Sequence, residues 1–213
     1  MIKILPKNFV IACDMDDVLL VPHTAIELSK YLGIYDHFSV PLIEYKTGKR
    51  SFESLLNDWF TIMTPLSSIN KQSAILHVSC GISENTYQFA EKSKKLGRFI
   101  IVSNNDGDLV KSIAGKLKVE YIAVNKYIFE FCFVTQRKSD AIENQKIIID
   151  AAVTDDQVNE KDFLDLPGKK NNTSCGIVFN RNDVITGPDI PYKIVNTLDE
   201  VYNTLAAIKN EFR

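Results

Sequence analysis

One short stretch, Phe9 to Leu20 with the sequence FVIACDMDDVLL, limits the possible folds of this chain most strongly. Five apolar residues end abruptly at Asp14, Asp16 and Asp17, after which the apolar run resumes. A short continuous apolar run predicts a strand of a parallel sheet, buried on both faces, which ends where the carboxylates begin. Because neighbouring carboxylates repel one another, they favour a protonated acid or a bound divalent cation such as Mg²⁺. The structural alternative is a solvated turn or an acidic helix N-terminus.

The stretch that follows, residues 21–81, shows helical periodicity and no strand pattern. Its strongest signal is at Phe52 to Met63, where apolar residues recur at steps of three and four after a possible N-cap, Ser51. We therefore predict a helical insertion between the first strand and the rest of the sheet.

Helix and strand patterns alternate after Gly81. The predicted helices are Ser83 to Leu96, Asp108 to Leu117, Lys138 to Asn144 and Leu198 to Ile208. The predicted strands are Arg98 to Val102, Tyr121 to Val124, Lys146 to Val153 and Gly176 to Phe179, with a β-prone hairpin or edge strand at Tyr127 to Val134. This alternation predicts an α/β fold, a Rossmann-like parallel sheet with helices on both faces.

Three of the apolar strands end in polar clusters, at Asp14 to Asp17, Ser103 to Asp106, and Asp155-Asp156. In parallel sheets, ligands bind beyond the carboxyl ends of the strands, near the point where the strand order reverses. Three strands with such ends favour a single active site over coincidence.

These clusters contain the groups that phosphoryl transfer needs. Asp14 can act as the nucleophile and form an acyl phosphate. Asp16 points to the same side of an extended backbone, so it can protonate the leaving oxygen and later activate water.

Other residues complete this predicted site. Ser103 and Asn104 are predicted to bind phosphate, and Lys138 to supply a fixed positive charge. The expected Mg²⁺ ligands are Asp14, Asp16, Asp155 and Asp156. The alternatives are a cap or turn role for Ser103 and a solvated helix start for Lys138.

Three further residues are candidates for contact with a substrate. His23 follows closely after the acidic cluster, and Arg50 could bind an anion from the insertion. Trp59 could stack on a substrate. Each has a structural alternative: a helix start for His23, an exposed loop for Arg50, and the core of the insertion for Trp59.

The candidate site residues resemble, in order, the four motifs of the haloacid dehalogenase (HAD) superfamily of phosphohydrolases. The correspondence is Asp14-Met15-Asp16, then Ser103, then Lys138, then Asp155-Asp156 with Glu160. The chain resembles in particular the phosphoserine phosphatase-like branch, which also contains a homoserine phosphotransferase. The features that carry this likeness are the helix-rich insertion, Gly48 to Leu56, Ile122 to Asn125, and Lys138-Ser139-Asp140-Ala141-Ile142.

The resemblance implies two domains. Residues 1–20 and 82–213 would form the HAD-like core, and residues 21–81 a small helical cap that closes over the site and selects the substrate.

Some positions depart from that branch. Asn104 and Asn105 stand where two glycines are usual, and Asp17-Val18 is more similar to the first motif of deoxyribonucleotidases. The acid and the arginine that would hold phosphoserine fall near His23 and Trp59, which argues against phosphoserine as the substrate.

Composition narrows the range of partners. The formal net charge is −2, the sequence pI is about 6.0, and basic residues are dispersed, so nothing points to a nucleic acid or an anionic membrane surface. We find no signal peptide or membrane span, and four cysteines without C-x-x-C spacing favour buried thiols in a reducing, cytoplasmic environment. The sequence carries no signal for the oligomeric state.

Together these features predict a cytoplasmic, Mg²⁺-dependent phosphatase that hydrolyses a small phosphorylated metabolite through an aspartyl-phosphate on Asp14. Two alternatives stay open: a phosphotransferase or 5′-nucleotidase on the same scaffold, and a binding or regulatory protein with weak catalysis.

Overall fold

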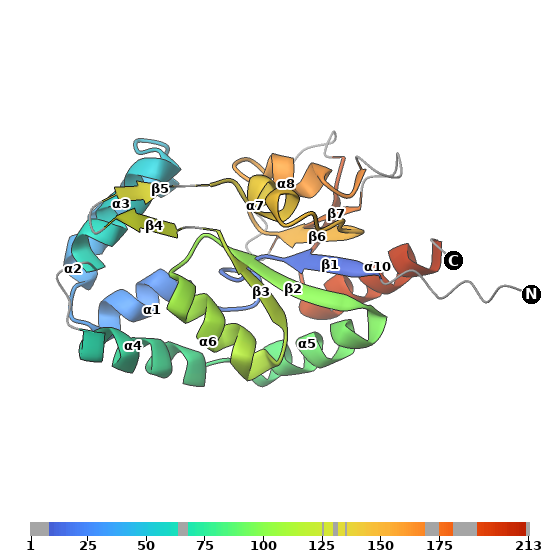
Figure 1. The fold of residues 1–213 in the computed structure, drawn as a ribbon, viewed down its shortest axis with the longest axis horizontal. Helices are drawn as coiled ribbons and strands as arrows, with labels where there is room; N and C mark the ends of the chain where they lie inside the picture. The colour runs from blue at the N-terminus through green and yellow to red at the C-terminus, as the bar shows by residue number, and fades with distance from the viewer. Residues whose placement is uncertain are drawn as a thin grey trace, which may run out of the picture.

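The computed structural model (Figure 1) describes residues 9–63, 68–124, 126–129, 132–134, 136–168, 175–180 and 191–211. Its centre is a six-stranded sheet in the order β3-β2-β1-β6-β7-β8. The strands are β1 (Val10–Cys13), β2 (Arg98–Ser103), β3 (Glu120–Ala123), β6 (Ala151–Thr154), β7 (Gly176–Phe179) and β8 (Lys193–Val195). Every neighbouring pair is parallel, which confirms the predicted fold class.

Strand β1 is at the middle of the sheet, between β2 and β6. Chain order runs outward from β1 to β3 on one side and from β6 to β8 on the other, so the strand order reverses between β1 and β6. Cys13 is level with Ile101 of β2 and Val153 of β6. The carboxyl ends of these three strands therefore reach the same edge of the sheet.

Helices cover both faces of the sheet, as the alternating pattern predicted. They are α5 (Glu84–Leu96), α6 (Gly107–Leu117), α7 (Lys138–Asn144), α8 (Lys161–Asp165) and α10 (Leu198–Glu211). Figure 1 shows α5, α6 and α10 on one side of the sheet and α7 and α8 on the other.

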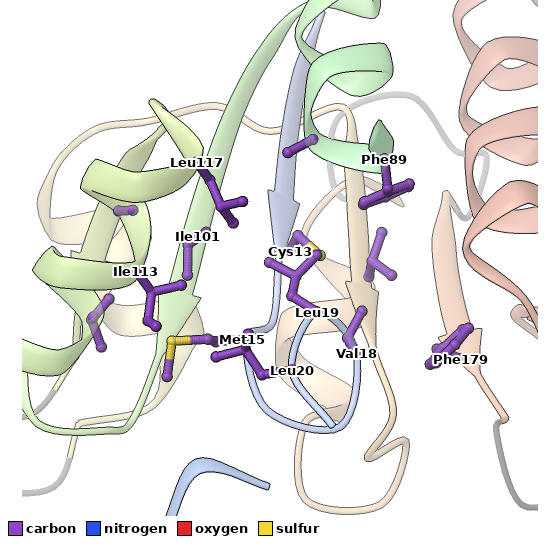
Figure 2. Packing of buried hydrophobic residues seen from close by; sticks show 14 of the residues in the cluster. Cys13, Met15, Val18, Leu19, Leu20, Phe89, Ile101, Ile113, Leu117 and Phe179 are labelled. Atoms are coloured by element: carbon purple, nitrogen blue, oxygen red, sulfur yellow. The ribbon is translucent and has the colours of Figure 1, made fainter. Parts of the chain in front are cut away.

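Alternate strand residues point into these two layers. Cys13 and Ile101 belong to the larger apolar cluster, which Figure 2 shows together with Phe89 of α5 and Ile113 of α6. Ala12 of β1 belongs instead to the smaller cluster on the opposite face, where the strands pack against α7 and α8.

Between β1 and α5 the described residues form four helices: α1 (Thr24–Tyr31), α2 (Tyr35–Lys46), α3 (Phe52–Met63) and α4 (Ser68–Cys80). α2 packs on α3, where the rings of Phe38 and Trp59 meet edge to face with centroids 4.7 Å apart. α4 packs on α6 of the core, and Lys71 of α4 lies 2.7 Å from Asp106, the N-cap of α6. The helical character predicted for this stretch is thus confirmed.

The β-prone segment after β3 forms an antiparallel hairpin, β4 (Lys126–Phe129) with β5 (Cys132–Val134). A hairpin was one of the two structures predicted there.

The strand predicted from Lys146 to Val153 is shorter than expected, since β6 begins only at Ala151. Lys146 has a positive φ of 55° and closes helix α7 through a hydrogen bond from its N–H to the carbonyl of Glu143. The Asp150 carboxylate accepts a hydrogen bond from the backbone N–H of Val10, 3.0 Å away. The first half of the apolar run is therefore a helix C-terminus and a connection to the sheet.

The thiols also differ in part from expectation. Cys13 and Cys175 are buried and free, as predicted, but the free thiol of Cys80 is exposed at the end of α4. None of the helices that the structure describes has the length and hydropathy needed to cross a bilayer.

Candidate active site

The polar strand ends meet at one cavity of about 220 Å³. It lies at the edge of the sheet where β1, β2 and β6 end, next to the reversal of strand order. The residues from these ends that line it are Asp14, Asp16, Asp17, Ser103, Asn104, Asn105, Asp155 and Asp156, together with Lys138 and Glu160. The structure thus brings together all of the predicted catalytic, phosphate-binding and metal-binding residues.

Asp14 occupies the first position after the central strand and is 7% exposed. Its backbone N–H continues the sheet pattern by donating to Val153, and its Oδ1 accepts a hydrogen bond of 2.7 Å from the N–H of Met15. Burial raises the pKa of Asp14, Lys138 opposes this rise, and the nearby carboxylates add to it. The carboxylate is therefore fixed in position and short of positive charge.

Lys138, the first residue of α7, supplies the cation at this position. Its ammonium lies 2.6 Å from Asp14 Oδ1 and 2.5 Å from Glu160 Oε1, and the side chain is almost fully buried. Burial lowers the pKa of Lys138, but the two carboxylates outweigh burial, so the net pKa is raised. The lysine is charged and shared between two acids.

Glu160 is the less obvious member of this group. It precedes α8, and its second oxygen accepts a hydrogen bond of 2.7 Å from the hydroxyl of Thr154. The sequence signal for Glu160 was its place in the fourth motif. Thr154 lies 3.4 Å from Asp14 Oδ2 and had no signal other than its position at the end of an apolar strand.

Asp16 contacts a set of hydrogen-bond donors that does not include Lys138. Its Oδ1 accepts from the N–H of Thr24 at 2.7 Å, and its Oδ2 accepts from the side-chain amide of Asn105 at 3.0 Å. Burial raises the pKa of Asp16, but the nearby His23 imidazole and the hydrogen bonds from Thr24 and Asn105 lower it more. The ligand-free protein therefore holds Asp16 as a carboxylate.

The amide of Asn105 links two segments of the site that are far apart in sequence, because it also bonds the hydroxyl of Thr24 at 2.6 Å. The backbone N–H of Asn105 donates to Ser103 Oγ at 3.1 Å, which fixes that buried hydroxyl at the end of β2. Sequence reasoning noted Asn105 only as a departure from a glycine and missed this role.

The three acids of the fourth motif have different surroundings. Asp156 accepts hydrogen bonds from the Tyr45 hydroxyl at 3.2 Å and the Asn159 amide at 2.7 Å, and Glu160 pairs with Lys138. Among the described residues, no side chain donates a hydrogen bond to Asp155 or forms an ion pair with it. Burial, together with the charges of Asp17 and Glu160, raises the pKa of Asp155 to about 7.

The four predicted Mg²⁺ ligands, Asp14, Asp16, Asp155 and Asp156, all line the cavity. Within the part of the chain that the structure describes, no group of three or more His, Cys, Asp or Glu side chains is placed to hold a metal ion. Asp16 and Asp156 are turned toward hydrogen-bond donors of their own. Asp14 is paired with Lys138, whereas no described side chain donates a hydrogen bond to Asp155.

Two of the three predicted substrate residues line the cavity. Trp59 is there, 4% exposed, and so is His23, whose Nδ1 lies 3.7 Å from Asp16 and accepts a hydrogen bond from the N–H of Ala25 as the N-cap of α1. Arg50 is not among the lining residues. Its guanidinium pairs with Glu44 at 2.7 Å and with Asp58.

A second and larger cavity, of about 530 Å³, shares no lining residue with the first. It lies against Val18 to Pro22 and the start of α10, and its walls contain none of the predicted site residues. Size alone therefore does not identify the site.

No protein-family model and no curated protein sequence matches this chain. Solved structures do match it. A HAD family hydrolase from Salmonella enterica subsp. enterica serovar Typhi is 17% identical, with a TM-score of 0.66 over 90% of this chain and 68% of that one.

Two phosphoserine phosphatase structures match over nearly their whole length. One, solved as an analogue of the phospho-aspartyl intermediate, has a TM-score of 0.67 and 18% identity over 92% of this chain and 98% of that one. A phosphoserine phosphatase solved with bound substrate has a TM-score of 0.67 and 17% identity over 92% of this chain and 98% of that one. At these identities the likeness establishes the fold, so the predicted HAD-like fold is confirmed.

Proposed function

We propose that this protein is a Mg²⁺-dependent phosphatase that hydrolyses a small phosphorylated metabolite through an aspartyl-phosphate on Asp14. The observation that carries the proposal is a buried carboxylate, Asp14, held 2.6 Å from the Lys138 ammonium at the carboxyl end of the central strand. One of the solved structures with this fold is described as a phospho-aspartyl intermediate analogue, which supports the same chemistry here.

The donor chemistry of the site fits Mg²⁺, a hard cation that prefers oxygen ligands. In phosphoryl-transfer sites Mg²⁺ is usually bound by one or two carboxylates, with substrate phosphate oxygens and waters in the other positions. Asp14 and Asp155 would supply the carboxylates. Both line the cavity, Lys138 contacts only Oδ1 of Asp14, and Oδ2 of Asp14 has only a 3.4 Å contact with the Thr154 hydroxyl. Bound Mg²⁺ would neutralise the charge on the phosphoryl oxygens.

In the first step the Asp14 carboxylate attacks phosphorus and a phosphorus–oxygen bond to Asp14 forms. The bond to the ester oxygen breaks, and that oxygen leaves with the electron pair and takes a proton from Asp16. A phosphate dianion close to Asp16 raises the pKa of that carboxyl group, so Asp16 can carry this proton when substrate is bound.

In the second step water attacks the phosphorus of the aspartyl-phosphate. The Asp16 carboxylate accepts the proton of this water, and the bond to Asp14 breaks to release phosphate and restore the enzyme. Lys138 stabilises the charge on Asp14 and the phosphoryl oxygens, and Ser103 and Asn104 bind the phosphate.

Residues 21–81 would act as the cap of this enzyme. The cavity supports this proposal, because α1, α2 and α3 supply the wall that faces the strand ends. A closed wall of this kind excludes water during the first step, and it must open to release phosphate.

The test is phosphate release from a panel of phosphorylated sugars, amino acids, nucleotides and alcohols, with Mg²⁺ and with a chelator. We expect release that needs Mg²⁺ and falls at least about a thousandfold in Asp14→Asn, because the nucleophile is lost. Asp199→Asn changes an exposed acid of α10 and is the matched control, expected to keep full activity. Acid-quenched protein should carry phosphate on Asp14.

Residual activity of Asp14→Asn close to the native level would contradict the nucleophile assignment. Faster transfer to added alcohols than to water would point to the phosphotransferase instead. Metal binding without any turnover would favour a binding protein.

A further inference from the structure

We infer that the substrate of this site is a phosphate monoester of an uncharged, largely apolar alcohol. This inference rests on the proposed function and adds the part of the substrate that the cap would recognise. Its basis is the division of the cavity into one charged end and one apolar wall.

The charged end is made of the strand-end residues. The described lining residues include one lysine, Lys138, no arginine, and one histidine, His23, which caps α1. Lys138 is 4% exposed, and its ammonium lies 2.6 Å from Asp14 Oδ1 and 2.5 Å from Glu160 Oε1. Its charge is therefore committed to the catalytic carboxylates and is not available to a second anion on the substrate.

The opposite wall comes from α1 to α3 and carries six apolar side chains: Ala25, Phe38, Leu42, Leu55, Leu56 and Trp59. Five of these residues are less than 9% exposed, and Leu56 is half-buried. Two polar atoms at its margin already have partners: the Tyr45 hydroxyl donates to Asp156 and accepts from the Asn159 amide, and His23 Nδ1 caps α1.

The one arginine of this helical stretch among the described residues, Arg50, is not available either. Its guanidinium is held by Glu44, Asp58 and the Ser54 hydroxyl, and it does not line the cavity. A carboxylate on the substrate would have to lose its hydration against leucine and aromatic side chains, and the described residues of this wall include no cation to replace it. A quaternary ammonium would lose its hydration against the same wall, where four of the six apolar residues are aliphatic and the rings of Phe38 and Trp59 pack edge to face on each other.

The volume of the cavity bears on the size of the substrate. A cavity of about 220 Å³ is smaller than the roughly 300–1,000 Å³ of sites for drug-sized ligands. This volume accommodates a branched or aromatic alcohol of a few carbons.

Binding of phosphonates tests this directly, because they bind without being hydrolysed. The probes are neohexylphosphonate, its isostere with a quaternary ammonium nitrogen in place of the branching carbon, and the phosphonate analogue of O-phosphoserine. Calorimetry on the full chain with Mg²⁺ should show neohexylphosphonate binding at least about tenfold more tightly than either charged probe. Equal or tighter binding of a charged probe would overturn the inference.

A pair of variants locates the effect on the wall. Leu56→Gln places a polar group on the wall at a half-buried position and should weaken neohexylphosphonate binding about tenfold. Ile43→Gln changes a residue of α2 that is 59% exposed and does not line the cavity, and it should leave the Kd unchanged. Unchanged binding in Leu56→Gln would place the apolar group elsewhere and overturn the inference.

Hydrolysis separates this inference from the proposed function. Release of phosphate from neohexyl phosphate by the native protein, with no release by Asp14→Asn, supports both the inference and the proposed phosphatase. A preference for the neutral phosphonate without any release from the matching ester would keep the inference and refute the phosphatase. Asp14-dependent release that is faster from O-phosphoserine would keep the phosphatase and refute the inference.

Discussion

At the scale of single residues, the site depends on how few positive charges balance its acids. Asp14 and Asp155 lie at the ends of the central strands and Glu160 precedes α8, and Lys138 is the cation that pairs with Asp14 and Glu160. A buried ion pair adds little stability by itself, but removal of one partner leaves an uncompensated buried charge. Stability and catalysis are therefore coupled at this position.

Replacement of the lysine tests this coupling. Lys138→Met keeps the volume and removes the charge, so the free energy of unfolding should fall by about 3–5 kcal/mol near neutral pH. The loss should shrink at acid pH, because the raised pKa of Asp14 lets it take up a proton. Urea unfolding measures both effects. Lys111→Met, at an exposed position of α6, should unfold like the native protein, and equal losses in the two variants would contradict the argument.

Asp155 makes the stability of the metal-free protein depend on pH. Its pKa is about 7 in the folded protein and about 3.9 in an unfolded chain. The folded state thus binds the extra proton between these values, so stability falls as the pH rises from about 4 to 7. Since Asp155 is partly exposed, solvent screens the effect, and we expect a loss on the order of 2 kcal/mol.

The measurement is urea unfolding of metal-free protein across this pH range. Asp155→Asn should be more stable than the native protein at about pH 8 and should lose the stabilisation that Mg²⁺ gives the native chain. Asp140→Asn, an exposed acid of α7, is the control. A native protein with flat stability from about pH 4 to 8 would contradict the assignment.

At the scale of elements, the sequence predicted what long apolar patterns specify. The strands at Val10–Cys13 and Arg98–Ser103 were found within a residue of their ends, because burial on both faces makes the run continuous. The predicted strand at Lys146 to Val153 was too long, because apolar residues near a helix C-terminus have the same pattern as a strand. The edge strand Lys193–Val195 was missed, since its three residues are too few to show a period.

The candidate site was predictable to the same extent. Acids that follow apolar strands mark the carboxyl edge of the sheet, so Asp14, Ser103 and Asp155 could be grouped from sequence. The direction of each side chain could not be predicted from the sequence. Asp16 and Asp156 face donors on Asn105 and Tyr45, which come from distant segments, and these contacts exist only in the folded chain.

Gly97 lies between helix α5 and strand β2, where the chain passes close to the backbone of Phe9. A Cβ on Gly97 would overlap the carbonyl oxygen of Phe9 and lie 2.7 Å from its carbonyl carbon, where β1 and β2 begin. Gly97→Ala should therefore lower the free energy of unfolding by about 3 kcal/mol or more, because backbone cannot move aside cheaply. Gly115→Ala in α6 meets no atom within 4 Å and should raise it by up to about 1 kcal/mol. Equal effects of the two substitutions would show that β1 can shift.

At the scale of the whole molecule, the helical insertion and the sheet share one hydrophobic cluster. Leu28 of α1, Trp59 of α3 and Ile75 of α4 belong to the same cluster as Ile11 and Ile101 of the sheet. Residues 21–81 are proposed as a cap, but within the described residues they have no hydrophobic cluster separate from that of the sheet. The wall of the active site is therefore stabilised by the same core that fixes the strand ends.

A shared core predicts cooperative unfolding, and the single tryptophan of the chain makes this measurable. Trp59 lies in the insertion and is 4% exposed, so its fluorescence reports that region, whereas far-UV circular dichroism reports all helices and strands. Because both regions lose the same core, the two urea transitions should have the same midpoint and slope. A substitution in the sheet, Ile101→Ala, should lower both midpoints equally, and the lost methyl and methylene groups should cost about 2–5 kcal/mol. If fluorescence changed at clearly lower urea than circular dichroism, residues 21–81 would unfold as an independent cap.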